Sequence, residues 1–88
     1  MPKYVIEREV EGVGRLSPAE LRQAARESDT VIRELGIQWI TSYVTDDKLY
    51  CVYVAESEEV IREHARCVDV PANRVSRVVT NIDAVTAE

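Results

Sequence analysis

The side chains best suited to hold a metal ion are one histidine and two cysteines: His64, Cys51 and Cys67. Cys51 lies in a β-branched and aromatic segment that predicts a strand, and the other two lie in an amphipathic segment that predicts a helix. Cys51 would lie ~13 Å before the strand end, and His64 and Cys67 ~10 and ~15 Å along the returning helix. This spacing predicts one soft-donor cluster for a divalent transition metal.

The same three residues also have simpler interpretations. A lone histidine on an apolar helix face is more often a half-buried core residue than a ligand, and a strand cysteine usually packs as a small hydrophobe. A disulfide between Cys51 and Cys67 is geometrically conceivable but not expected in a reducing compartment. A nucleophilic Cys–His site lacks an orienting third group and an oxyanion donor. Spacing alone therefore leaves metal binding open beside these roles.

Carboxylates could add oxygen donors at the surface, although most of them belong to solvated faces or helix starts. They form two groups in the sequence: Glu7, Glu9 and Glu11, and Glu56, Glu58 and Glu59. Gly12 and Gly14 have a spacing that could suggest phosphate binding, but no dinucleotide or Walker pattern follows them. We assign no chemistry to this loop.

Composition limits the function classes. The 88 residues are 45% hydrophobic and 31% charged, which predicts one globular domain over residues 1–88. Sixteen acidic against eleven basic residues give a net charge of −5, which argues against nucleic acid or an anionic membrane as partner. No apolar run approaches the ~20 residues of a spanning helix, and no export signal is evident. We expect a cytoplasmic protein with reduced thiols.

The pattern of elements predicts the fold. Strands are expected at residues 4–10, 38–45, 48–55 and 75–79, although Glu7, Arg8 and Glu9 interrupt the alternation of the first. Ser17 and Ser57 mark the starts of two amphipathic helices. The order β-α-β-β-α-β predicts a ferredoxin-like α+β fold, an antiparallel four-stranded sheet with both helices on one face. Residues 80–88 are expected to form either a short fifth strand or a loose tail.

The hairpin at residues 38–55 presents two faces, and only one can lie under the helices. The predicted register pairs Val44 with Leu49, Ser42 with Cys51 and Ile40 with Tyr53. Whichever face the helices cover, the other would be a large apolar patch, which a soluble monomer rarely exposes. We therefore predict a homodimer packed sheet to sheet, and a marginal core of this size also favours self-association. The expected interface residues are Trp39, Tyr43, Tyr50, Val52 and Val54.

Residues 4–10, 42–55, 61–66 and 71–78 resemble the small bacterial nickel-binding ferredoxin-like proteins, which were long grouped as a domain of unknown function. The resemblance implies a homodimer that binds nickel ions for sequestration or storage and has no established catalytic activity. Cys51 and His64 match motif positions of this family. Cys67 stands where the family usually has a basic residue, and Val70 where it usually has an aromatic one.

We therefore expect a cytoplasmic, non-catalytic Ni(II)-binding homodimer with His64, Cys51 and Cys67 as metal donors; other divalent transition metals could bind the same donors. One alternative is a dimeric α+β-barrel enzyme, such as a cofactor-independent monooxygenase or an isomerase. Its pocket between sheet and helices would have His64, Tyr53, Cys51 and Ser42 nearby. A ligand-sensing module is a further alternative. No second titratable partner for His64 is evident, which disfavours the enzyme.

Overall fold

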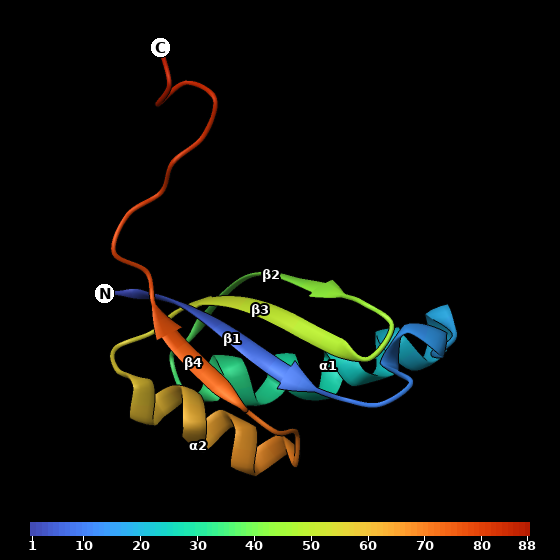
Figure 1. Ribbon diagram of the computed structural model, residues 1–88. Helices are drawn as coiled ribbons and strands as arrows, with labels where there is room; N and C mark the ends of the chain where they lie inside the picture. Colours follow the sequence, from blue (N-terminus) through green and yellow to red (C-terminus); the bar gives the residue numbers. More distant parts are fainter.

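The computed structural model describes residues 1–88 as a four-stranded antiparallel sheet covered on one face by two helices (Figure 1). The strand order is β2-β3-β1-β4, and this arrangement confirms the predicted ferredoxin-like α+β fold. Along the chain the elements are β1 (Lys3–Glu9), the 3-10 helix η1 (Val13–Arg15), α1 (Pro18–Glu34), β2 (Gln38–Val44), β3 (Lys48–Val54), α2 (Glu58–Val68) and β4 (Arg74–Arg77). No helix is long and apolar enough to cross a membrane.

Both helices begin where their capping residues predict. The Ser17 hydroxyl accepts from the Glu20 amide at 3.2 Å, and the Glu20 carboxylate accepts from the Ser17 amide at 2.9 Å, so α1 has a complete capping box. Ser57 caps α2 by accepting from the Val60 amide. Helix α2 ends at Val68, and the left-handed backbone of the next residue, Asp69, turns the chain toward β4.

Inward-facing side chains of β1 and β3 form the centre of the core. Tyr4 pairs with Tyr53, and Ile6 pairs with Cys51, so these residues lie under the helices. Ile32 of α1 and Ile61 of α2 close this cluster from above. The buried core cluster consists of Tyr4, Ile6, Ile32, Ile37, Cys51, Tyr53, Ala55 and Ile61.

The predicted register of the hairpin is right at its turn and wrong at its open end. Val44 pairs with Leu49 and Ser42 with Cys51, but a β-bulge between Trp39 and Thr41 makes Trp39, not Ile40, the partner of Tyr53. The extra residue moves the Trp39 side chain to the helix-covered face. There the indole packs edge-on against the Tyr53 ring at 6.5 Å between centroids and donates to the Ser42 hydroxyl. The prediction that Trp39 belongs to the opposite face is therefore wrong.

The opposite, outer face of the sheet carries an apolar strip with no helix over it. The other four predicted interface residues, Tyr43, Tyr50, Val52 and Val54, share this face, with Val5 of β1 beside Val52. Tyr43 is 62% exposed, and the other three are half-buried. In the single chain this strip is open to solvent.

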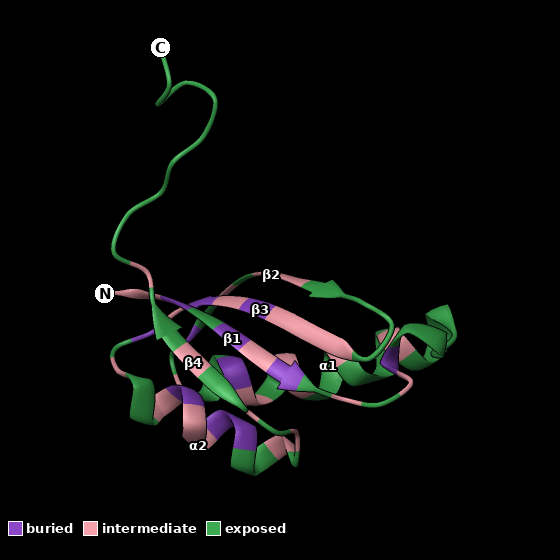
Figure 2. Ribbon diagram, in the orientation of Figure 1, coloured by how far each residue is buried: buried purple, intermediate pink, exposed green.

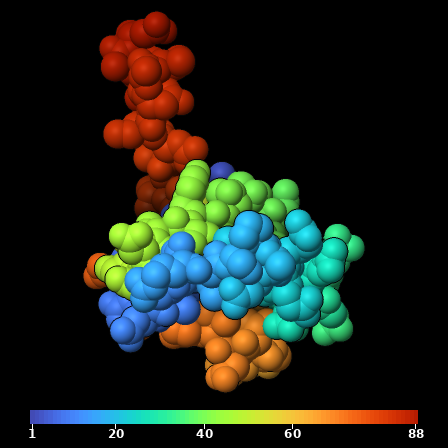
Figure 3. All heavy atoms as spheres, turned by 90° about the vertical axis from the view of Figure 1, so that its right-hand side faces the viewer, coloured from blue at the N-terminus to red at the C-terminus, as the bar shows by residue number.

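The residues that follow β4 form a tail rather than a fifth strand. Val78 donates one backbone hydrogen bond to Lys3, after which the chain leaves the sheet (Figure 3). A turn over residues 84–87 ends the segment. Three aliphatic side chains, Val79, Ile82 and Val85, are largely exposed along it. Residues 80–88 therefore form no fifth strand in this structure.

Gly14 has a packing role that explains the glycine-containing loop. Its amide donates to the Asp46 carbonyl at 3.0 Å, and a Cβ at Gly14 would lie 2.7 Å from the carbonyl oxygen of Thr45 and 2.8 Å from the Asp46 Cα. The loop after β1 therefore lies directly against the backbone of the β2–β3 turn. Glycine is required here because a neighbouring backbone approaches closely, not because of a phosphate.

We expect Gly14→Ala to lower the free energy of unfolding by about 1–3 kcal/mol, because the hairpin backbone must move to admit the methyl group. Urea denaturation followed by circular dichroism measures the change. Gly36→Ala is the comparison for backbone strain without a clash, since Gly36 has open space around its Cα but a positive φ of 70°, which costs an alanine about 1–2 kcal/mol. A Gly14→Ala protein as stable as the wild type would contradict the close approach.

Candidate functional site

A cavity of about 570 Å³ lies between α1, the β2–β3 hairpin and α2. The first turns of α1 line this cavity instead of packing onto the sheet. Their apolar side chains at the cavity are Leu21, Ala24 and Ala25. Figure 2 shows this part of α1 mostly as exposed, whereas Ile32 near its end is buried in the core. The apolar stripe of α1 is therefore buried only toward its C-terminal end. The other part of the stripe is one wall of the cavity.

His64 enters this cavity from α2 and is 1% exposed. Its Nε2 lies 2.9 Å from the Ser28 hydroxyl of α1, and its ring stands edge-on to the Tyr53 ring at 5.7 Å between centroids. Its Nδ1 is buried and has no hydrogen-bond partner. Burial and the charge of Arg8 lower the pKa of the imidazole, outweighing an opposing hydrogen bond with Ser28. His64 is therefore neutral near pH 7, with one ring nitrogen unsatisfied.

Arg8 is a buried cation at the same cavity, and it is not among the site residues predicted from the sequence. It is 2% exposed. Its guanidinium donates to the Pro71 carbonyl at 3.0 Å and to the Tyr53 hydroxyl at 3.4 Å, and its Cζ lies 5.9 Å from the centre of the Tyr53 ring. No carboxylate forms an ion pair with it. Strict period-2 alternation from Tyr4 through Ile6 would have placed Arg8 inward.

Cys51 and Tyr53 form the floor of the cavity on β3. Both are buried, at 3% and 2% exposure. Burial and the neighbouring Cys51 raise the pKa of Tyr53 to about 12, against the opposing effect of Arg8. The Tyr53 hydroxyl is therefore protonated at neutral pH, and it can donate a hydrogen bond while it accepts one from Arg8.

Cys67 does not join His64 and Cys51. It lies on the exposed side of α2, where its Sγ is 3.6 Å from Oε1 of Glu63. Local desolvation and the Glu63 carboxylate raise the pKa of this thiol, so it is protonated at neutral pH and a metal would have to displace the proton. The structure thus places two of the three predicted donors at one cavity and the third on the surface. No group of three or more His, Cys, Asp or Glu side chains is placed to hold a metal ion.

The cavity donors do not fit a divalent cation within one chain. A Ni(II) site needs several donors, and carboxylates or thiolates would offset its charge. Here the buried charge is the positive one of Arg8, and the acidic residue on the cavity wall, Asp29, is ion-paired with Arg33 at 3.0 Å. A cation beside Arg8 would meet repulsion in a poorly solvated site.

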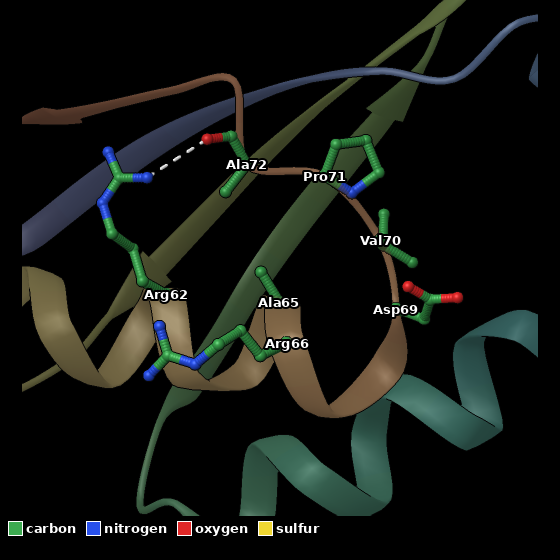
Figure 4. Close-up of a pocket in the computed structure, with 7 residues that line it drawn as sticks. All are labelled: Arg62, Ala65, Arg66, Asp69, Val70, Pro71 and Ala72. Carbon is green, nitrogen blue, oxygen red and sulfur yellow. Dashed lines mark hydrogen bonds between the residues drawn. The ribbon is translucent and has the colours of Figure 1, made fainter.

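A second hollow of about 440 Å³ lies outside α2, against the loop that leads to β4 (Figure 4). Arg62 reaches across it and donates to the Ala72 carbonyl at 3.3 Å. Arg8 holds the preceding carbonyl, that of Pro71, from the inner side. Two arginines thus fix the same loop from opposite sides, so this outer hollow has a structural explanation.

Comparison with known proteins agrees with this architecture. The family model described as "Nickel responsive protein SCO4226-like" matches residues 4–78. The crystal structure of SCO4226 from Streptomyces coelicolor A3(2) superposes with a TM-score of 0.78 over 91% of this chain and 99% of that chain, at 13% sequence identity. At that low identity, the superposition shows a shared fold and nothing more. No functionally curated protein matches the sequence.

Proposed function

The chain belongs to the SCO4226-like family of nickel-responsive proteins, and we propose that it binds Ni(II) as a small non-catalytic homodimer. The observation that carries this proposal is the family match over residues 4–78, which includes every strand and helix except the first residue of β1. We also propose a cytoplasmic location, where the free thiols of Cys51 and Cys67 stay reduced.

The pair of Cys67 and Glu63 is the donor set we favour in the single chain. The two side chains lie one helical turn apart on α2, in reach of each other and of solvent. A thiolate and a carboxylate together carry the negative charge that a divalent ion requires, once the ion takes the place of Arg66, which pairs with the Glu63 carboxylate. Because Cys67 stands where relatives usually have a basic residue, this donor set would be particular to this chain.

Dimerisation enters the proposal through the apolar outer face of the sheet and not through the metal donors. Glu63 and Cys67 supply two ligands on the helix side of the chain, whereas Ni(II) in nitrogen, oxygen and sulfur sites takes four or more, the remainder being water. His64 and Cys51 stay the alternative donor pair, since a neutral imidazole with an unbonded Nδ1 and a thiol line one cavity. The two donor sets lie in separate places, so variants can distinguish them.

We expect tag-free protein to take up Ni(II) in isothermal titration calorimetry and Cys67→Ser to weaken that uptake at least about tenfold. Glu63→Gln should weaken it in the same direction, because a neutral amide is a poorer donor than a carboxylate. Both residues lie on the surface of α2, so circular dichroism should show unchanged folding.

The matched control is the interior pair, Cys51→Ser and His64→Gln. These variants should leave nickel affinity unchanged if the surface donors hold the ion. If the interior variants lose nickel uptake while Cys67→Ser keeps it, then His64 and Cys51 hold the ion. Absence of nickel uptake by the wild-type protein would contradict the proposed function itself.

A further inference from the structure

We propose that the cavity between α1 and the sheet binds a small organic acid, with its carboxylate between Arg8 and His64 and its apolar body against α1. This site is separate from the favoured nickel donors, Glu63 and Cys67, on the outer side of α2. The inference stands on the cavity itself and does not depend on nickel binding.

Arg8 supplies the main argument, because it is a buried charge without a counter-ion. Its two hydrogen-bond partners, the Pro71 carbonyl and the Tyr53 hydroxyl, are both uncharged. A buried guanidinium is ordinarily paired with an anion, since neutral acceptors offset its desolvation only in part. Its planar fork of N–H groups matches a carboxylate. An organic anion entering the cavity would supply the missing charge.

His64 supplies a second and independent argument. Its Nδ1 is fully buried and unpartnered, and an unsatisfied buried ring nitrogen costs free energy unless a ligand or water meets it. When Nε2 accepts from the Ser28 hydroxyl, the proton resides on Nδ1, which is then a donor that no acceptor of this chain satisfies. The Tyr53 hydroxyl accepts from Arg8, and the Tyr53 ring stands edge-on to His64, so this side chain lies beside both groups.

The walls of the cavity indicate that the part of the ligand beyond its carboxylate is apolar. Thirteen of its nineteen lining residues are hydrophobic, and its volume lies within the range of small-molecule sites. Leu21, Ala24 and Ala25 of α1 and Leu49 of β3 line the space, and an apolar ligand would remove their side chains from water. Ile40 and Val44 of the edge strand β2 are partly exposed on its wall, so they lie where a ligand could enter.

One buried cation and an otherwise apolar wall favour a monocarboxylate over a phosphate ester or a nucleotide. A phosphate carries about two charges and is usually met by several basic groups or a helix N-terminus. The other charged residue on the wall, Asp29, is engaged by Arg33 and lies on α1. We therefore choose decanoate as the probe, with decan-1-ol as its uncharged match.

Calorimetric titration of the full chain with the two probes tests the site. Decanoate should bind at least about tenfold more tightly than decan-1-ol, because only the acid can pair with Arg8. Arg8→Met keeps the length and apolar stem of the side chain but removes its charge. It should lower decanoate affinity at least about tenfold and leave decan-1-ol affinity nearly unchanged. Equal affinity for the two probes, or no binding of either, would overturn the proposal.

Two further measurements keep the test decisive if Arg8→Met alters folding. Ala25→Phe fills the cavity from α1 without touching Arg8, and it should block decanoate and decan-1-ol alike. Decanoate should also shift the ¹⁵N resonance of His64 Nδ1 in the wild-type protein, which a purely structural role of Arg8 would not produce. An unchanged resonance at saturating decanoate, or undiminished binding to Ala25→Phe, would place the acid elsewhere and overturn the inference.

Discussion

Val52→Asp is expected to convert the proposed homodimer into a monomer. In sedimentation equilibrium the apparent mass should fall from twice the 10.0 kDa chain mass to that of a single chain. We expect the dimer dissociation constant to rise at least about a hundredfold, because a carboxylate at the centre of a packed apolar face leaves an unpaired buried charge.

Val52 suits this test because it is central on the outer face of the sheet. It pairs with Val5 on one side and Thr41 on the other, so an opposing sheet would cover it completely. It is only half-buried in the single chain, and its aspartate variant can therefore fold as a monomer. The exposed Val79, Ile82 and Val85 of the tail are further apolar surface that a second copy could cover.

Val44→Asp is the matched control, because Val44 is a partly exposed valine on the helix side of the neighbouring strand. It should leave the mass of the dimer unchanged. A monomeric wild-type protein at micromolar concentration would contradict the proposed assembly. A dimer that persists in Val52→Asp would move the interface away from the outer face.

The fold could be predicted because its signals are local. Ser17 and Ser57 fix the helix starts through hydrogen bonds within one turn, and the β-branched runs define the strands. The bulge at Trp39 was not predictable in this way. It arises because the indole finds an edge-on contact with Tyr53 and a hydrogen bond to Ser42, and the alternation of residue types does not reveal a single inserted residue.

The candidate site was predictable only in part. The sequence predicts that His64 and Cys51 lie at the same height along the helix and the strand. In the structure both residues line the same cavity. The sequence could not place Cys67, because a position three residues along a helix shares a face only approximately with His64. Arg8 was missed since a charge in a strand is ordinarily solvated. Its burial depends on Pro71 and Tyr53, which lie 63 and 45 residues away in the chain.

His64 should make the protein lose stability between pH 7 and pH 5. Burial and the charge of Arg8 lower its pKa in the folded protein, whereas the unfolded chain takes up a proton near pH 6.5. The unfolded state therefore binds more protons as the pH falls through that value, and protonation favours unfolding. The free energy of unfolding should decrease by up to about 1.4 kcal/mol per pH unit in this window.

Comparison with His64→Gln isolates this contribution. Glutamine is uncharged at every pH in the window and can still form a hydrogen bond with Ser28, so its stability should vary less with pH on the acid side. Urea unfolding at fixed protein concentration, repeated at half-unit intervals, gives both profiles. Carboxylates such as Glu20 and Glu63 titrate identically in the two proteins and cancel in the difference. A buried neutral imidazole must make the free energy of unfolding fall more steeply toward acid pH than glutamine does. If the two proteins show the same pH dependence of stability, the imidazole at position 64 is not held neutral.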